Sequence, residues 1–509
     1  MISRPPIARA RGFGRFEKAF VTALVLTGAL LLFTGLDNRF LWQDEAQTAL
    51  IGRTVLTRGL PYGTDGINYF SQEEGAEYGP DHIWKWHPWL QFYLAALSFK
   101  IMGPTTLAAR LPFALFGLGT IVLLYFFARR LWPDKRAAEV AAVLLLFCLW
   151  FLILARQARY YAPAAFFSLW GLHAYLGLAE RRPWSMAGFI MAAALLFHTH
   201  YLYAGTLLAT VLVHGFIYHR GEIKRLVLAC LLICVICSPW IVWLATLKYQ
   251  EAFGAEIIGF AAIFSRLLDF AKQVAAYVFP FYLAALPLIV EAVLRFRKKT
   301  SFFLEIGFWQ DLSLPGLFVI FNLAALSLTS PLAFFRYLAP LIPPLLALAG
   351  LLIHQSWRLF PPLAVLLMIT ALILQPLKGY LFEITHRFPS PTRSLVEFLR
   401  EKARPGDVVA ITYGDLPLKF YTGLRIVGGL TGEDPALVKQ AKWVIIRRKA
   451  SGPLDLALRD YYLRRLDLKD YRTIILDSPD YPHENRESPD VHPFSLPQGH
   501  PPVMVLERK

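Results

Sequence analysis

Long runs of apolar residues recur along most of the chain, separated by short polar segments. The runs at 20–35, 107–128 and 226–245 are each close to the ~20 residues that a helix needs to cross ~30 Å of hydrocarbon. These runs are apolar on every face, whereas helices of soluble proteins alternate apolar and polar faces. The pattern predicts an α-helical polytopic membrane protein, and it disfavours a large soluble protein with buried helices.

We expect about eleven spans, and one shorter apolar run at 89–102 that does not cross. That run has only ~14 residues and contains Lys100, and a further crossing would turn every later basic cluster to the opposite side. It is therefore predicted to lie along the outer membrane surface as an interfacial helix. The predicted spans lie near 18–36, 107–128, 137–156, 163–180, 186–201, 203–218, 226–246, 272–294, 312–330, 338–354 and 359–376.

Lysine and arginine set the predicted orientation. Basic residues precede the first span and cluster at 129–136, 181–182, 220–225 and 295–299, as expected for cytoplasmic loops facing anionic lipid. The first apolar run is too long for a signal peptide, so we expect an uncleaved first span with a cytoplasmic N-terminus. The prediction is a multi-pass protein of the cytoplasmic (inner) membrane, surrounded by membrane lipids.

This topology gives the outer face the longer polar segments. They are the first loop at 37–106, which is far above the usual loop length, the turn at 156–161, an amphipathic surface segment at 248–270, and the turn at 331–337. The inner face has only short basic loops. We therefore expect the polar chemistry on the outer side.

The pattern of apolar and polar residues changes after residue 376. This change divides the chain into a membrane domain, 1–376, and a C-terminal domain, 377–509. Short buried strands are predicted at 406–415, 441–447 and 471–476, and amphipathic helices at 391–403, 433–440 and 455–465. This alternation predicts a small α/β domain, and an odd number of spans makes it extracytoplasmic. The proline-rich stretch 478–502 is predicted to be an ordered loop or lid.

Composition agrees with the hydrophobic pattern, since 56% of the 509 residues are hydrophobic and only 17% are charged. Soluble proteins average about 45–50% and about 25%. The net charge of +16 does not indicate nucleic acid, because the basic residues lie between apolar runs without base-stacking aromatics. The four cysteines all fall inside apolar runs, without zinc or disulfide spacing.

Two adjacent carboxylates, Asp44 and Glu45, follow the first span in FLWQDEAQTAL. Acids in a first helical turn favour the helix dipole, and this structural interpretation stays open. However, the preceding Phe-Leu-Trp would hold the pair at the membrane interface, where an acid can accept a proton from an incoming hydroxyl. The pair is therefore a candidate catalytic site.

Arginine and tyrosine pairs end two of the predicted spans on the outer side. Arg156, Arg159 and Tyr160 lie in ARQARYYAP, and Arg336 and Tyr337 lie in FFRYLAP. Snorkelling arginines at helix ends are one interpretation. Positive charge on the outer face runs against the usual bias, and guanidinium groups bind phosphate bidentately. We therefore favour a binding site for a phosphorylated lipid headgroup, and we expect Arg156, Arg159 and Arg336 to converge in one outer-facing cavity.

Three histidines are also predicted at the outer interface: His87 in WKWHPWLQ, and His198 and His200 in FHTHYLYA. Residues two apart do not share a helix face, which disfavours a helical metal pair. Hydrogen bonding to phosphate or sugar is one role for them, and an ordinary interfacial histidine is the simpler alternative.

Together these segments resemble the GT-C class of membrane glycosyltransferases. The matching pieces are the acidic pair after the first span, HPWLQFYLAALSFKIMG, AARLPFALFGLGTIVLLYFFARRLW, the ARQARYYAP turn and FFRYLAPLIPPLLAL. In their order they are most similar to the protein O-mannosyltransferase-like family, glycosyltransferase family 39, which includes the aminoarabinose transferase acting on lipid A. The resemblance covers roughly residues 18–380.

The resemblance implies a polyprenyl-phosphate-linked sugar donor and transfer with inversion to a hydroxyl of a lipid, glycan or protein acceptor. It makes Asp44 the catalytic base, and it allows a divalent metal ion. For inversion we expect Asp44 and the arginines to face each other across a sugar-sized gap rather than in a closed salt bridge. Glu45 is expected to point elsewhere and act in support. The chain departs from the lipid A enzymes twice. His87-Pro-Trp stands where they have Lys-Pro-Pro, and Arg159-Tyr160-Tyr161 stands where they have a carboxylate. These departures weaken any inference of metal ligation or of an aminoarabinose donor.

Two other classes of function remain. A transporter or flippase of lipid-linked sugars would place charged residues within its spans and show internal repeats, and neither is evident. A non-catalytic membrane scaffold with an outer binding domain would not need the acidic pair. The sequence favours a polyprenyl-phosphate-dependent glycosyltransferase, whose C-terminal domain covers the site or receives the acceptor.

Overall fold

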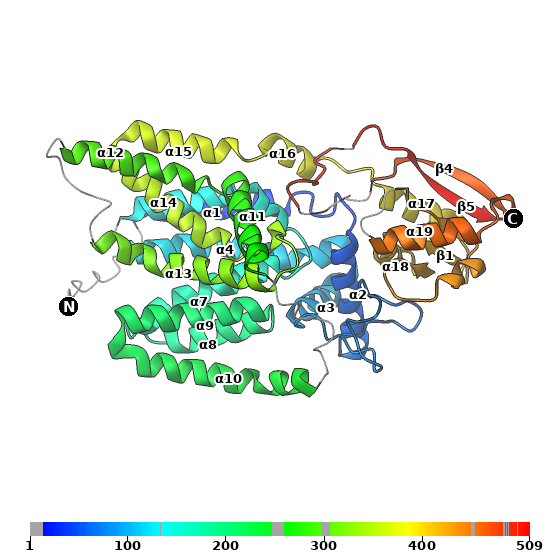
Figure 1. Ribbon diagram of the computed structural model, residues 1–509, viewed down its shortest axis with the longest axis horizontal. Coiled ribbons are helices and arrows are strands. Elements are labelled where there is room, and N and C mark those ends of the chain that lie inside the picture. Colours follow the sequence, from blue (N-terminus) through cyan, green and yellow to red (C-terminus); the bar gives the residue numbers. More distant parts are fainter. Residues whose placement is uncertain are drawn as a thin grey trace.

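A bundle of helices and a smaller α/β domain make up the molecule (Figure 1). The computed structural model describes residues 14–132, 134–246, 259–296, 306–448, 453–481, 484, 486, 488–495 and 497–509. The bundle contains α1 (Arg15–Phe33), α4 (Thr106–Leu131), α5 (Lys135–Leu146), α6 (Leu149–Ala155), α7 (Tyr161–Ala179), α8 (Ser185–Phe197), α9 (Tyr201–Tyr218), α10 (Ile223–Thr246), α11 (Phe260–Tyr277), α12 (Ala285–Phe296), α13 (Ile306–Thr329), α14 (Ile342–Leu359), α15 (Pro361–Ile373) and α16 (Leu377–Thr385).

Each of the eleven predicted spans contains one or more of these helices, and the chain is a multi-pass membrane protein. Five of the described helices are long and apolar enough to cross a bilayer, or eight when each bent pair counts as one span. The predicted total of eleven crossings therefore stays a prediction.

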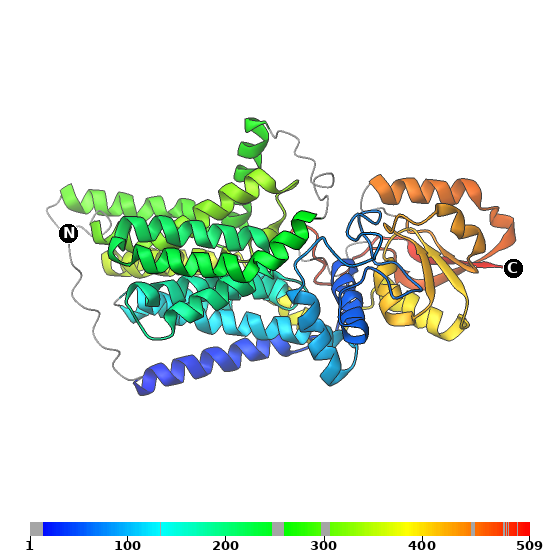
Figure 2. The ribbon, with the colours of Figure 1, turned by 90° about the horizontal axis from the view of Figure 1, so that it is seen from below.

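Two predicted spans are wrong as single helices. The span 137–156 is divided between α5 and α6, which are bent by 63°. The other is 272–294. Its segment is divided between α11 and α12, which are bent by 79°. The break contains Pro280, which lacks a backbone N–H and disfavours helical geometry at the residue before it. α11 runs across the other helices (Figures 1 and 2), as expected of a surface segment. The amphipathic surface segment was predicted at 248–270, and its part at 248–258 lies outside the described residues.

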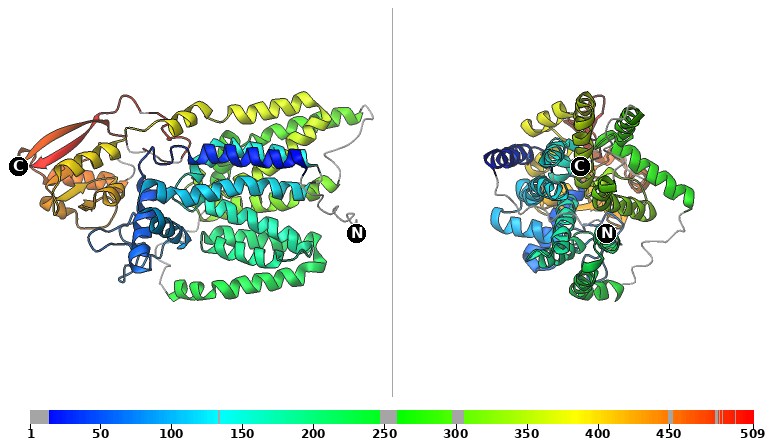
Figure 3. Two further views of the ribbon diagram at one scale, coloured as in Figure 1. Left: turned by 180° about the vertical axis from the view of Figure 1, so that it is seen from behind. Right: turned by 90° about the vertical axis from the view of Figure 1, so that its left-hand side faces the viewer.

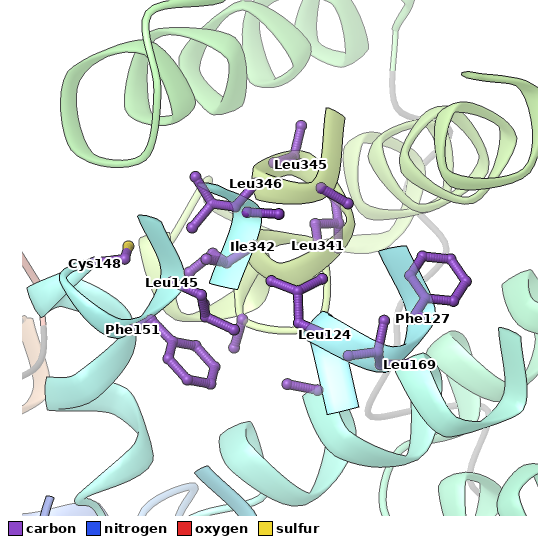
Figure 4. Close-up of a cluster of buried hydrophobic side chains, with 14 of the residues drawn as sticks. Leu124, Phe127, Leu145, Cys148, Phe151, Leu169, Leu341, Ile342, Leu345 and Leu346 are labelled. Carbon is purple, nitrogen blue, oxygen red and sulfur yellow. The ribbon is translucent and has the colours of Figure 1, made fainter. Parts of the chain in front are cut away.

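The core of the bundle is formed by apolar side chains from α4, α5, α7 and α14 (Figure 4). Leu124 of α4 and Leu145 of α5 face Ile342 of α14, and all three are fully buried. α14 and α5 lie so close together that a Cβ on Gly350 would be 2.7 Å from the backbone nitrogen of Ala141. Small residues at such contacts allow helices to pack closely in membranes.

Ion pairs place the basic clusters at the end of the bundle away from the α/β domain. Arg129 pairs with Glu17 of α1, Arg130 with Glu180 at 3.0 Å, and Arg181 with Glu222 at 2.6 Å. Three of the four predicted clusters, 129–136, 181–182 and 220–225, thus gather at one end. Most of the fourth, 295–299, lies outside the described residues. We call the opposite end, which carries the α/β domain, the domain end (Figures 1 and 3).

The long first loop forms an ordered layer between the bundle and the α/β domain. It contains α2 (Gln43–Arg58) and α3 (Leu90–Met102), which pack closely because Gly52 of α2 faces Ala95 of α3. α3, which covers the run predicted to be an interfacial helix, is only 13 residues long and lies beside α2 at the domain end (Figure 1). This layer places the acidic pair, Asp44 and Glu45, at the domain end of the bundle.

The C-terminal α/β domain has a five-stranded mixed sheet of order β2-β1-β3-β5-β4. Strands β2, β1 and β3 are parallel, and β5 is antiparallel to both β3 and β4. The strands are β1 (Val408–Ile411), β2 (Arg425–Gly428), β3 (Trp443–Ile445), β4 (Tyr471–Pro479) and β5 (Pro502–Arg508), and the helices are α17 (Pro391–Lys402), α18 (Asp415–Thr422) and α19 (Pro453–Arg465).

The three predicted strands are confirmed, whereas β2 and β5 were missed. β2 has only four residues, with Arg425 and Gly428 at its ends, so it lacks the apolar signal of a strand. β5 directly follows the proline-rich stretch. The predicted helix at 433–440 is instead a 3₁₀ segment, Pro435–Gln440.

The α/β domain is fixed to the first loop and to the bundle. Asp415 and Lys419 of α18 form a fully buried ion pair, and Gln43 of α2 donates to Asp415 at 2.8 Å. The segment 480–501, described in part and here called the strap, returns to the bundle, where His492 contacts Glu383 of α16 at 2.7 Å. Since Tyr380 of α16 also donates to a carbonyl of α1, the domain boundary at 376 stays a prediction.

Candidate active site

Asp44 lies in the first turn of α2 and meets cations from two other parts of the bundle. Its Oδ2 is 3.5 Å from Nη1 of Arg336 and 3.7 Å from Nη2 of Arg159. Its Oδ1 accepts a hydrogen bond of 3.2 Å from Nε2 of Gln72, in the first loop. The side chain keeps 15% of its surface exposed, so the carboxylate is held and still accessible.

Arg159 is placed by the tight turn between α6 and α7. Its Nη1 donates to the backbone carbonyl of Asp44 at 3.3 Å and to the hydroxyl of Thr48 at 3.4 Å. Its Nε is buried and, among the described residues, has no hydrogen-bond partner. A buried guanidinium with a free donor has capacity for a further anionic ligand.

Arg336 belongs to a short 3₁₀ turn, Phe335–Leu338, between α13 and α14. Its guanidinium carbon lies 4.5 Å from the ring centroid of Phe334 and 5.6 Å from that of Tyr337. Stacking on aromatic faces fixes the orientation of a guanidinium. The backbone of Tyr337 is held in turn by a 2.8 Å hydrogen bond from the hydroxyl of Tyr203.

Two of the three predicted histidines join this cluster. Burial and the positive charges of Arg159, His200 and Arg336 hold the pKa of His87 well below its usual range, so its imidazole is neutral. Nδ1 of His87 and Nδ1 of His200 are buried, and within the described part of the chain neither has a hydrogen-bond partner. The ring of His200 lies 4.9 Å from that of Tyr160.

His198 lies apart from this cluster. Its backbone carbonyl accepts a 3.1 Å hydrogen bond from the amide of Leu90 at the start of α3, and its ring lies 5.7 Å from that of Trp240 on α10. These contacts fix α3 to the bundle and fit the simpler interpretation of an interfacial histidine.

Glu45 has a different environment from its neighbour Asp44. It is fully buried, and its two oxygens accept hydrogen bonds of 2.7 and 2.6 Å from Nε and Nη2 of Arg110 on α4. The backbone amide of Ala158 also donates to it at 2.9 Å. Glu45 thus points away from Asp44, as expected, and its hydrogen bonds orient α2; its supporting role stays a prediction.

The expectation that Arg156 converges with Arg159 and Arg336 is wrong. Arg156 points instead to the end of α1, where Nη1 donates to the carbonyls of Leu32 and Thr34 at 2.8 Å. The last carbonyls of a helix have no partners within the helix, so a cation there satisfies them and favours the helix dipole.

A second expectation needs correction, because Asp44 and the arginines do not face each other across an open gap. They form loose ion pairs, at distances well beyond the about 2.7–2.9 Å of a charge-assisted hydrogen bond. The two guanidinium groups and the one carboxylate together keep a net positive charge. Because opposite charges attract, direct contact of the carboxylate with both guanidinium groups is favourable when no other anion is present.

Sequence reasoning missed Gln72, Glu73 and Tyr203. Burial and the neighbouring charge of Asp44 raise the pKa of Glu73, so a second carboxylate lies near Asp44. Gln72 and Glu73 come from the middle of the long first loop, where no periodic pattern marks a residue. Tyr203 resembles any other aromatic residue of an apolar run.

No metal centre is evident at this site. Among the described residues, no group of three or more His, Cys, Asp or Glu side chains could hold a metal ion. Arg159 and Arg336, which both approach Oδ2 of Asp44, would also repel a divalent cation. The arrangement therefore fits an anion such as phosphate better than a metal.

A family model described as "Dolichyl-phosphate-mannose-protein mannosyltransferase" matches residues 86–243. This stretch runs from the first loop through α10 and includes Arg159 and both clustered histidines. Asp44 and Arg336 lie outside it. The matched segment and the fold likenesses below both point to GT-C glycosyltransferases.

Solved structures extend the similarity to almost the whole chain. "ArnT from Cupriavidus metallidurans bound to Undecaprenyl phosphate" is 16% identical, with a TM-score of 0.59 over 96% of this chain and 98% of that one. "Archaeal oligosaccharyltransferase AglB from Archaeoglobus fulgidus in complex with an inhibitory peptide and a dolichol-phosphate" is 11% identical, with a TM-score of 0.53 over 85% and 69%. At these identities the similarity establishes the fold, which is that of GT-C glycosyltransferases.

Proposed function

We propose, for this chain with the GT-C glycosyltransferase fold and a matching mannosyltransferase-family segment, that it transfers a sugar from a polyprenyl-phosphate donor to an acceptor hydroxyl, with inversion. The acceptor is a lipid, a glycan or a protein. Asp44 is the catalytic base, and Arg159 and Arg336 bind the donor phosphate.

One observation carries this proposal: the meeting of an accessible carboxylate with two arginines from distant parts of the chain. Arg159 and Arg336 approach the same oxygen of Asp44. A base for a hydroxyl proton and cations for a departing phosphate are the two elements that direct displacement of a lipid phosphate requires. Two of the similar structures are complexes with undecaprenyl phosphate and with a dolichol-phosphate, which supports this class of donor.

The reaction is a single displacement at the anomeric carbon. The acceptor oxygen forms the new bond to that carbon while its proton passes to Asp44. The bond from the anomeric carbon to the phosphate oxygen breaks, and its electron pair leaves with the lipid phosphate. The phosphate thereby gains one negative charge, which the guanidinium groups of Arg159 and Arg336 stabilise more strongly in the transition state than in the donor.

Donor binding also explains the loose ion pairs. A phosphate placed between Arg159 and Arg336 competes for the same N–H groups as Asp44, and it can accept bidentate hydrogen bonds from each guanidinium. The 3.5 and 3.7 Å contacts are weak enough to be exchanged. Asp44 would then be released to act as a base only after the donor has bound.

His87 and His200 are proposed to bind the donor beside the arginines, with Tyr160 and Tyr337 shaping the pocket. A neutral imidazole can donate one hydrogen bond to phosphate or sugar without adding charge. The unpartnered Nδ1 atoms of both histidines supply that capacity. A divalent metal has no part in this proposal.

The distribution of lysine and arginine indicates on which side of the membrane the site lies. Because the described basic clusters gather at the end away from the site, we infer that this end is cytoplasmic. The site, the first loop and the α/β domain would then lie on the outer face of the cytoplasmic membrane. Cysteine labelling of intact cells, at residues introduced near 134 and 456, tests this: only the second should react with a membrane-impermeant reagent.

The catalytic proposal is tested with Asp44→Asn in reconstituted membranes, where transfer from labelled polyprenyl-phosphate sugars is measured. Loss of a positioned base should lower turnover by at least ~10²-fold, while undecaprenyl phosphate binding is retained. Arg159→Ala and Arg336→Ala should weaken that binding. Arg220→Ala, which removes an exposed arginine at the opposite end, is the matched control. Near-normal transfer by Asp44→Asn would refute the assignment of the base.

A further inference from the structure

A tight turn of the first loop, residues 71–77, carries the residue that contacts Asp44 on the side away from the arginines. Nε2 of Gln72 donates to Oδ1 of Asp44 at 3.2 Å, whereas Arg159 and Arg336 approach Oδ2. The two oxygens of the carboxylate therefore have different partners. A difference of this kind allows one oxygen to be held while the other reacts.

The turn is rigid because its polar groups are bonded internally. The buried carboxylate of Glu77 accepts hydrogen bonds from the hydroxyl of Ser71 and from the backbone amide of Gln72, the latter at 2.7 Å. Gln47 of α2 lies 3.4 Å from the same carboxylate. Gln72 is thus attached, through Glu77, to the helix that also carries Asp44.

The α/β domain holds the outer side of the same turn. The backbone amide of Glu74 donates to the carbonyl of Leu430 at 3.0 Å. A Cβ on Gly432 would lie 2.5 Å from the carbonyl oxygen of Glu74, so the two backbones are in direct contact. Glu74 has a φ of +53° and Gly75 a φ of +90°, a conformation that must be held by its surroundings.

The other charged groups near Asp44 come from separate elements. Arg159 lies before α7 and Arg336 lies before α14, while Glu73 is on the turn itself and Tyr160 follows Arg159. When the donor phosphate occupies both arginines, Oδ2 loses its partners. The hydrogen bond from Gln72 to Oδ1 is then the described side-chain contact that still fixes the carboxylate.

We propose that Gln72 is a positioning residue that holds Oδ1 of Asp44 so that Oδ2 faces the acceptor hydroxyl, and that the α/β domain supports it through the turn 71–77. This inference rests on the proposed role of Asp44. It gives the C-terminal domain a part in the reaction that is separate from covering the site or receiving the acceptor.

The decisive variants are Gln72→Ala and Gln72→Glu, examined for turnover, donor KM and the acidic limb of the pH–rate profile. Gln72→Ala should lower turnover roughly 10-fold, about the loss of one hydrogen bond to a charged group, and leave donor KM unchanged. Gln72→Glu keeps the shape but places a negative charge beside Asp44, which favours the protonated carboxyl. Its acidic midpoint should rise by about one pH unit.

The contribution of the domain is tested at a distance with Gly432→Val. Its side chain would collide with Glu74 and displace the turn, so turnover should fall as in Gln72→Ala, again at unchanged donor KM. Gly423→Val is the matched control, because Gly423 has a similar φ of +70° in the same domain but no atom within 4 Å of its Cβ position. It imposes the same backbone strain without the collision and should keep normal turnover.

The outcomes separate this inference from the proposed function. Full activity of Asp44→Asn would refute the assignment of Asp44 as the base, on which this inference rests, and absence of transfer by the unmodified protein would refute the proposed function itself. If Asp44→Asn is inactive but Gln72→Glu has an unshifted acidic midpoint, Gln72 does not position the base and the inference is overturned. Equal losses in Gly432→Val and Gly423→Val would show a general effect of domain strain and would overturn the contribution of the turn. Undecaprenyl phosphate binding by each variant checks that it is folded.

Discussion

The pairing of Glu45 with Arg110 makes a sharp prediction about stability. Both side chains are buried, at 0% and 5% exposure, and they share two hydrogen bonds shorter than 2.8 Å. Replacing Glu45 by methionine leaves the guanidinium of Arg110 in the interior without its carboxylate. Removing one partner of such a pair costs roughly 3–5 kcal/mol. We expect a value near the upper end, because the amide of Ala158 also loses its acceptor.

The complementary change, Arg110→Met, should be at least as costly. Besides leaving the Glu45 carboxylate without its cation, it removes the donors to the backbone carbonyls of Leu36 and Arg39, at 2.9 and 2.8 Å. In the double variant no uncompensated charge remains. The double variant should therefore be no less stable than Arg110→Met alone, with a coupling free energy of roughly 2–3 kcal/mol, at the high end for residues in direct contact.

The assay is thermal unfolding of purified protein in detergent, followed by the loss of monodisperse protein on size-exclusion chromatography. Each single variant should lower the Tm by several degrees, and the double variant should lower it by less than the sum. Lys272→Met, which removes an exposed ion pair with Asp269, is the control and should change the Tm little. If the Tm changes of the two single variants add up in the double variant, the pairing of Glu45 with Arg110 is refuted. Glu45 would then again be a carboxylate available for catalysis.

Three further predictions follow from the corrected site. Arg156→Met should lower thermal stability, because the last carbonyls of α1 lose their donors, yet leave undecaprenyl phosphate affinity unchanged, whereas Arg159→Met should weaken that affinity. Glu383→Gln should weaken the contact with His492, so that limited proteolysis cleaves the strap faster than in the unmodified protein. His87 binds fewer protons folded than unfolded, because its pKa is lowered on folding, so stability should decline as the pH falls below about 6.5. His87→Gln should reduce that decline between pH 7 and 5 in thermal unfolding scans.

Within a few residues of one another, similar residue types have different roles. Asp44 and Glu45 are consecutive, and consecutive residues point in different directions from a helix. Arg156 and Arg159 are three residues apart, in the turn between α6 and α7. Glu45 turns into the layer between α2 and α4, while Asp44 remains at the surface that the arginines reach. In the same way, Arg156 ends α6 against α1, while Arg159 begins the next helix and faces α2.

The sequence by itself determined the class of the protein and the position of its polar chemistry. Hydrophobic runs must be buried in lipid wherever they occur, so the helical segments, the basic end of the bundle and the α/β domain could all be predicted from local pattern. The acidic pair also stood out in the local pattern, because the preceding Phe-Leu-Trp would hold it at the membrane interface, and the catalytic role of Asp44 stays a prediction. These are properties of short stretches of chain.

Only the tertiary structure decided which charges meet. Arg336 reaches Asp44 across 292 residues, Arg110 selects Glu45 across 65, and Gln72 arrives from an irregular loop. Contacts of this kind depend on how helices pack and on which turn faces which, and a single sequence does not record them. The sequence therefore supplied the candidate groups, and packing at the domain end divided them into those that hold the fold and those proposed to bind a phosphate and accept a proton.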